Sequence, residues 1–91
     1  MAGEHAWREF PRRRDGVRHA LAGGLWLHRW RMDGRPMAHL VSSDRDALMA
    51  WGRAHGLDAR WIQFKPLKDL NTGQRVPCWH WDLWEHQIPK A

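Results

Sequence analysis

The stretch LWLHRWRMDGRPMAHLVS, residues 25–42, decides the fold. Side chains alternate along residues 25–32 and again along residues 37–42 with the two-residue period of a β-strand. Between the two runs, DGRP at residues 33–36 is typical of a turn, because glycine tolerates a positive φ and proline lacks a backbone N–H. The sequence therefore predicts two consecutive strands joined by a tight turn.

A helix is predicted directly after this pair of strands. Ser43 and Asp46 have the spacing of a capping pair, and apolar residues then recur at helical spacing. Gly56 is a typical C-terminal cap. We therefore expect a helix over residues 44–55.

The rest of the chain completes a small α/β domain. Residues 59–64 and 75–82 have the pattern of strands, and residues 83–88 are expected to form a short terminal helix. We expect a single-layer sheet of about four strands covered by one main helix, over residues 17–91. Residues 1–16 have no period and carry an arginine triplet, so we expect a flexible basic arm.

The charge of the chain favours an anionic partner. Lysine and arginine number 15 against 10 acidic residues, and the first 35 residues hold eight arginines against four acids. This skew fits nucleic acid or an acidic protein surface, although an arginine-rich composition also serves solubility alone. The single cysteine excludes an internal disulfide. A single cysteine suits a reducing compartment, and no apolar run is long enough to span a membrane. These two features together predict a cytoplasmic protein.

A second stretch, CWHWDLWEH at residues 78–86, carries the densest set of polar and aromatic residues. If it is a strand, its first two tryptophans point to one face, and His80 and Asp82 stand about 7 Å apart on the other. Such a pair can share a metal ion or a hydrogen bond. The alternative is that Asp82 and Glu85 are a capping pair at the start of the terminal helix.

Four segments together resemble a small bacterial and phage family, the domain of unknown function 4031. They are HLVSSD (39–44), ALMAWGRAHGL (47–57), RWIQ (60–63) and HWDL (80–83). The resemblance covers roughly residues 37–84. It implies a polar pocket made of His39, Asp44, Gln63, His80 and Asp82.

The most serious departure of the chain from that family is at two positions, and Trp81 in place of a Tyr is a milder one. Ala47 and Met49 stand where the family pattern has Glu and His. If those two residues support an activity, this chain keeps the fold without it. The family supplies no established activity to carry over.

The first functional hypothesis is a non-catalytic binding protein of bacterial or phage origin. Arginines bind phosphate backbones, and exposed tryptophan rings stack on bases. The residues expected to bind nucleic acid are Trp7, Arg12, Arg13, Arg14, Arg29, Trp30 and Arg31. An interaction or inhibitor protein that docks on an acidic protein surface uses the same residue types and is the alternative.

The second hypothesis is a metal-dependent hydrolase of phosphoesters. His39, His80 and Asp82 would bind a divalent metal, and Asp44 or Glu85 would be a further ligand or base. Such donors suit Zn, Mn or Fe. The hypothesis requires that residues distant in the sequence converge.

Overall fold

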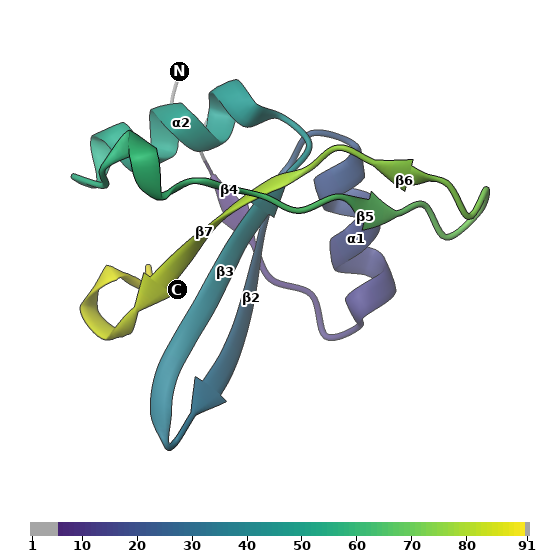
Figure 1. The fold of residues 1–91 in the computed structure, drawn as a ribbon. Helices are drawn as coiled ribbons and strands as arrows, with labels where there is room; N and C mark the ends of the chain where they lie inside the picture. The colour runs from purple at the N-terminus through teal and green to yellow at the C-terminus, as the bar shows by residue number, and fades with distance from the viewer. Residues whose placement is uncertain (1–5, 91) are drawn as a thin grey trace.

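The computed structural model describes residues 6–90 and shows a mixed α/β fold, which confirms the predicted class (Figure 1). The elements are β1 (Trp7–Arg8), α1 (Arg13–Leu21), β2 (Leu25–Met32), β3 (Arg35–Ser42), α2 (Arg45–Ala54), the 3₁₀ turn η1 (Ala59–Trp61), β4 (Gln63–Phe64), β5 (Leu67–Lys68), β6 (Arg75–Val76), β7 (Trp79–Trp84) and the 3₁₀ turn η2 (Glu85–Gln87). Five strands form one sheet in the order β1-β2-β3-β7-β4, and β5 and β6 form a separate pair. Among residues 6–90, no helix has the length and apolar character to span a membrane.

The predicted hairpin forms, and its strands β2 and β3 are the longest of the sheet. Its strands pair antiparallel from Met32 opposite Arg35 to Trp26 opposite Val41. Asp33 and Gly34 both have positive φ, at 50° and 78°, which is the conformation of a type I′ turn. This turn matches the twist of the two strands and fixes their register.

Strand β7 lies between β3 and β4 and is antiparallel to both. The predicted terminal helix over residues 83–88 is wrong, because β7 continues to Trp84, which pairs with Met37. Only the single turn η2 follows. The predicted strand over residues 75–82 is interrupted after Val76, since Pro77 cannot donate to a ladder.

Two more predicted boundaries are corrected locally. Residues 59–64 form η1 followed by the two-residue strand β4, because the Asp58 carboxylate accepts from the N–H of Arg60 and caps the 3₁₀ turn. Helix α2 confirms the predicted helix, but its N-cap is Asp44, which accepts from Ala47 N–H at 3.0 Å. Ser43 instead donates its hydroxyl to the carbonyl of Ala20 at the end of α1.

The predicted flexible arm over residues 1–16 is wrong for its described part. Trp7–Arg8 pairs in parallel with β2, and α1 begins at Arg13, so the predicted domain boundary after residue 16 falls inside a helix. Residues 1–5 of the predicted arm lie outside the described residues. The helix forms because Val17 and Ala20, three positions apart, are buried on the sheet.

The two helices cover opposite faces of the sheet, so the structure has a second covering helix that the sequence analysis did not expect (Figure 1). Adjacent residues of a strand point to opposite faces, and the core divides accordingly. The α2 side contains Leu25, Leu27, Ala38, Leu40, Leu48, Trp51, Trp81, Leu83 and Ile88. The α1 side contains Val17, Ala20, Trp26, Val41, Leu67 and Cys78.

Each helix approaches the sheet through a glycine that lies on a tryptophan ring. A methyl group at Gly52 would overlap the ring of Trp81, and one at Gly16 would overlap the ring of Trp26. The indole N–H of Trp81 also donates to the carbonyl of Leu48 in α2 at 2.8 Å. These contacts set how closely each helix lies on the sheet.

We expect Gly52→Ala to lower the free energy of unfolding by about 1–3 kcal/mol, because the added methyl overpacks the contact with Trp81. In an unconstrained helix the same change is stabilising by up to about 1 kcal/mol. Urea denaturation measures the difference. The neighbouring exposed change Arg53→Ala is the control and should stay within about 0.5 kcal/mol of the parent. A more stable Gly52→Ala variant would contradict the close contact.

Candidate metal-binding site

The face of the sheet that carries α1 also carries the polar residues of β3 and β7. His39 of β3 lies directly opposite Asp82 of β7, and His28 of β2 lies opposite His39 on the other side. His80 precedes Asp82 by two residues and therefore shares its face. This division of β7 confirms the prediction that its histidine and aspartate oppose its buried tryptophan, Trp81.

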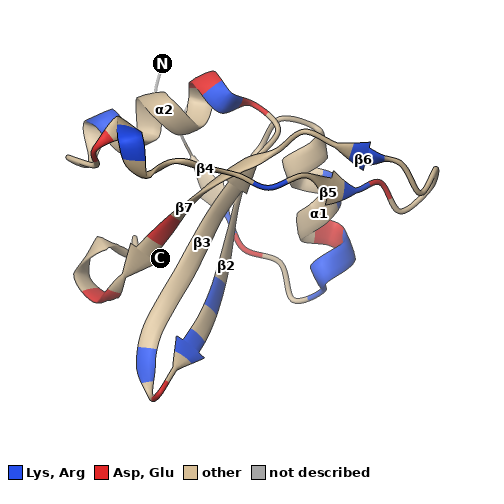
Figure 2. Cartoon of the chain, viewed as in Figure 1, with Lys and Arg blue, Asp and Glu red and all other residues tan. Residues whose placement is uncertain are grey.

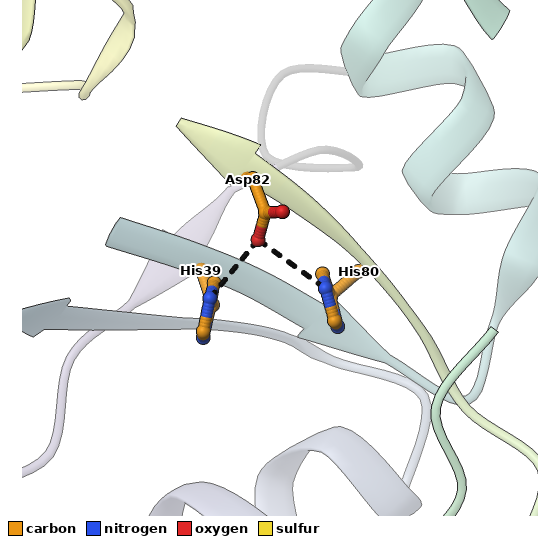
Figure 3. Close-up of side chains that lie close together, drawn as sticks. All are labelled: His39, His80 and Asp82. Carbon is orange, nitrogen blue, oxygen red and sulfur yellow. Dashed lines mark ion pairs between the residues drawn. The ribbon is translucent and has the colours of Figure 1, made fainter. Parts of the chain in front are cut away.

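His39, His80 and Asp82 converge on one point (Figure 3). The Nε2 atom of His39 lies 3.0 Å from Oδ1 of Asp82, and Nε2 of His80 lies 3.3 Å from the same oxygen. Ligand atoms of the three residues all fall within 4.8 Å of one another. The predicted convergence is therefore confirmed, and the three residues could hold a metal ion.

Only one of the two oxygens of the Asp82 carboxylate accepts a hydrogen bond from the described residues. Its Oδ2 accepts from Nε2 of Gln63 at 2.9 Å. Its Oδ1 is buried and has no hydrogen-bond donor within residues 6–90, although the two imidazole nitrogens lie 3.0 and 3.3 Å away. Buried carboxylate oxygens normally have donors. An oxygen that faces two imidazole nitrogens without a hydrogen bond suits a shared cation.

The environment keeps both imidazoles neutral at neutral pH. Burial lowers the pKa of His39, and the neighbouring His80 lowers it further, although Asp82 acts in the opposite direction. Burial is also the main cause that lowers the pKa of His80. A neutral imidazole has a free ring nitrogen lone pair, which is the form that binds metals.

The site is open to solvent on one side. The side chain of His80 is 8% exposed, whereas those of His39 and Asp82 are 31% and 34% exposed. A hollow of about 480 Å³ adjoins Asp82. It is lined by Arg60, Trp61, Gln63, Asp82, Trp84 and Gln87. A ligand can therefore reach the carboxylate from solution.

The structure brings together four of the five residues of the predicted polar pocket. Gln63 joins His39, His80 and Asp82 through its hydrogen bond to the carboxylate. Asp44 does not belong to the group, because its side chain caps α2 on the other side of the sheet. The alternative interpretation of Asp82 as a helix cap is also wrong, since this residue lies within β7.

Glu85, the other predicted further ligand, lies in η2 and is exposed. Its backbone has a positive φ of 41°, at the point where the chain turns away from β7. Within residues 6–90 it is not part of the group of potential ligands. No extra ligand or base is therefore supplied by either predicted acid.

The predicted nucleic-acid residues fall into two groups, one on β1 and β2 and the other at the start of α1. Arg29 is tied to Glu9 at 2.9 Å and to the carbonyl of Pro89, and Arg31 donates to the carbonyl of Gly34. Trp7 is partly buried against the α2-side core. Trp30 lies beside the metal-ligand group, with its ring 5.4 Å from that of His39 and its buried Nε1 unpartnered within the described residues.

The predicted Arg12, Arg13 and Arg14 remain exposed at the start of α1. Arg13 also lies over the ring of Trp26 at 5.6 Å. These three are the predicted arginines whose side chains stay available for an anionic partner.

Several residues around the site were missed by the sequence analysis. His28 extends the row of polar residues, and Lys65 acts electrostatically on both candidate histidines. Trp61 and Trp84 line the adjoining hollow. The alternation along residues 25–32 puts His28 on the same face as Trp26, so its position could have been predicted from the sequence. The position of Trp61 could not, because it depends on the 3₁₀ turn η1.

No family model, curated protein or solved structure matched this chain in three comparisons. The resemblance to the domain of unknown function 4031 and the bacterial or phage origin therefore stay predictions. The geometry of the site is therefore the basis for the function proposed below.

We expect Asp82→Asn to leave the free energy of unfolding within about 0.5 kcal/mol of the parent, or to raise it, at pH 8 in the presence of a chelator. The carboxylate has a buried oxygen without a donor, so neutralising it removes a desolvation cost. Urea denaturation measures the change. Leu83→Ala, at a fully buried neighbour, should cost about 2–5 kcal/mol in the same assay. A loss above about 1 kcal/mol for Asp82→Asn would show that the carboxylate serves the fold.

Proposed function

We propose that His39, His80 and Asp82 bind one divalent transition-metal ion and that the chain uses it to hydrolyse a phosphate ester. The observation that carries the proposal is the approach of two imidazole nitrogens to a single carboxylate oxygen, at 3.0 and 3.3 Å, beside a solvent-accessible hollow. Ligands of a tetrahedral ion, each about 2.0–2.1 Å from it, stand roughly 3.3 Å apart. The two separations to the carboxylate oxygen are close to that value, and the three ligand atoms all lie within 4.8 Å of one another.

The donor set narrows the choice of metal. Two imidazoles and one carboxylate suit zinc, manganese or iron(II), and they are harder donors than the thiolates that select copper(I). Three protein ligands leave a position for water or substrate, which is the pattern of catalytic sites. A bound ion of this kind lowers the pKa of water and polarises a phosphoryl oxygen.

The charges around the site favour an anionic substrate. Lys65 is close enough to lower the pKa of both His39 and His80, after the larger effect of burial. On the other side, Arg13 lowers the pKa of His28, again after burial. Two cations therefore act on the row of histidines that surrounds the carboxylate. Such a field attracts phosphate groups.

Gln63 positions the site. Its amide donates to Oδ2 of Asp82, which directs Oδ1 toward the two histidines. Residues that hold a ligand in this way commonly change metal affinity by about 10–100-fold when they are mutated. In this arrangement the two histidines and Asp82 hold the ion, and Gln63 fixes the carboxylate.

We expect the purified chain to bind one zinc or cobalt(II) ion, measured by elemental analysis and by the cobalt absorption spectrum. Binding should stabilise the fold by about 2.7 kcal/mol at a metal concentration 100 times the dissociation constant. His80→Ala, His39→Ala and Asp82→Asn should each abolish this gain and the hydrolysis of a model phosphodiester. His86→Ala is the control, because His86 is an exposed histidine outside the group.

Two results would contradict the proposal. One is the absence of stabilisation by zinc, manganese, cobalt or iron(II). The other is a metal stoichiometry that is unchanged in His80→Ala. If the chain binds iron(II) and does not hydrolyse phosphate esters, the metal-site proposal holds and the proposed hydrolysis is wrong. Oxygenase chemistry is then the alternative, since the same donor set holds iron in oxygenases.

A second candidate function, nucleic-acid binding, is favoured by a basic surface next to the site. Figure 2 shows cationic residues on α1 and on the β5–β6 pair beside it. Arg13, Arg14 and Arg18 line a hollow together with Leu70 and Asn71 of the β5–β6 loop. Lys68 and Arg75 stand directly opposite each other on β5 and β6. Like charges in that position are unfavourable for the strands, so an anionic partner would relieve them.

We expect a labelled single-stranded oligonucleotide to bind at low salt and to dissociate steeply as salt rises. Replacing Arg13, Arg14 and Arg18 together by alanine should reduce the slope of log affinity against log salt by about 2, at roughly 0.7 per lost phosphate contact. The control replaces Arg45 and Arg53, two exposed arginines of α2. If binding is instead observed to an acidic protein and not to the oligonucleotide, the alternative partner is supported.

A further inference from the structure

We infer that the hollow beside Asp82 binds a nucleoside monophosphate, with its base between Trp61 and Trp84 and its phosphate directed to the metal site. This inference rests on the proposed function for the phosphate end, whereas the binding of the base stands on the hollow itself. The same chemistry is offered by a free nucleotide and by the terminal nucleotide of a single strand.

Two tryptophans form the aromatic part of the hollow. Trp61 and Trp84 line it together and are 55% and 47% exposed, whereas Trp51 and Trp81 are almost completely buried. Large apolar side chains left in solvent inside one concave site indicate a ligand surface. Stacking on such rings is the usual way in which proteins bind unpaired bases.

The amide side chains of the hollow have complementary groups left for a base. Gln63 uses its Nε2 on Asp82, which leaves its Oε1 as an acceptor. Gln87 uses its Oε1 to accept from the backbone N–H of Trp84, which leaves its Nε2 as a donor. A donor and an acceptor in one pocket suit the edge of a nucleobase. The volume, about 480 Å³, lies within the roughly 300–1,000 Å³ typical of small-molecule sites.

Charge distinguishes a nucleotide from a neutral stacking ligand such as an oligosaccharide. Arg60 borders the hollow, and its guanidinium donates three hydrogen bonds to Asp58, at 2.7, 3.1 and 3.2 Å. Asp82 also lines the hollow, and it belongs to the metal-ligand group as well. A base in the hollow would therefore have its phosphate within the reach of the cation proposed there. A neutral sugar would use neither feature.

The test is calorimetric titration of the intact chain with AMP, adenosine, inorganic phosphate and a four-nucleotide oligodeoxythymidylate. We expect AMP to bind more tightly with zinc present than with a chelator, and adenosine to bind equally in both conditions. Trp61→Ala and Trp84→Ala should each weaken adenosine and AMP by at least about fivefold. Trp61→Phe and Trp84→Phe, which keep an aromatic ring, should restore most of the affinity.

Phe64→Ala is the matched control, because Phe64 is a 61% exposed aromatic residue of the adjacent strand that packs on Trp79 and does not line the hollow. It should bind AMP as the parent does. Stronger binding of the oligonucleotide than of AMP would assign the site to strand ends, and equal binding would assign it to free nucleotides.

The failure of this inference differs from the failure of the proposed function. In His80→Ala, zinc should no longer increase the affinity for AMP, whereas adenosine should bind as it does to the parent. A loss of metal binding alone therefore does not contradict the proposed base-binding site. The inference is overturned if neither AMP nor adenosine binds, if the alanine variants bind as tightly as the parent, or if maltopentaose binds in their place.

Discussion

The close contact between a helix glycine and a tryptophan ring, made once on each face of the sheet, is the constraint on which this structure depends. Gly16 lies on Trp26, and Gly52 lies on Trp81. Because these glycines lack a side chain, two helices can lie close to a sheet whose largest core residues are indoles. The longer helix, α2, closes its face with a continuous apolar core. The shorter α1 covers only the end of the other face and leaves the histidines and Asp82 open beside it.

The parts of the fold that could be predicted from the sequence are those set by local periodicity. The hairpin around Asp33 and Gly34 follows from alternation and turn chemistry, and α2 follows from its apolar spacing and its caps. Other parts depend on contacts that are distant in the sequence. Helix α1 has few apolar residues, so it becomes visible only when Val17 and Ala20 meet the sheet. Trp84 extends β7 because Met37 is there to pair with it.

The site divides in the same way. His80 and Asp82 share a face through the strand period, which the sequence shows directly. Their meeting with His39 also needs the register between β3 and β7, and no local pattern specifies that register. The spacing of Asp44 was equally suggestive, yet the structure uses it to cap a helix. Which acid faces the histidines is therefore decided by strand pairing.

The burial of Cys78 has a consequence for the motion of the chain. This lone thiol is fully buried between α1 and the sheet, and burial raises its pKa, so it is inert while α1 stays in place. A thiol reagent can reach it only after α1 or the β5–β6 segment lifts. The rate of its modification would therefore time the opening of that layer separately from the layer under α2. The buried thiol of Cys78 is therefore a built-in probe of local opening on the α1 side of the sheet.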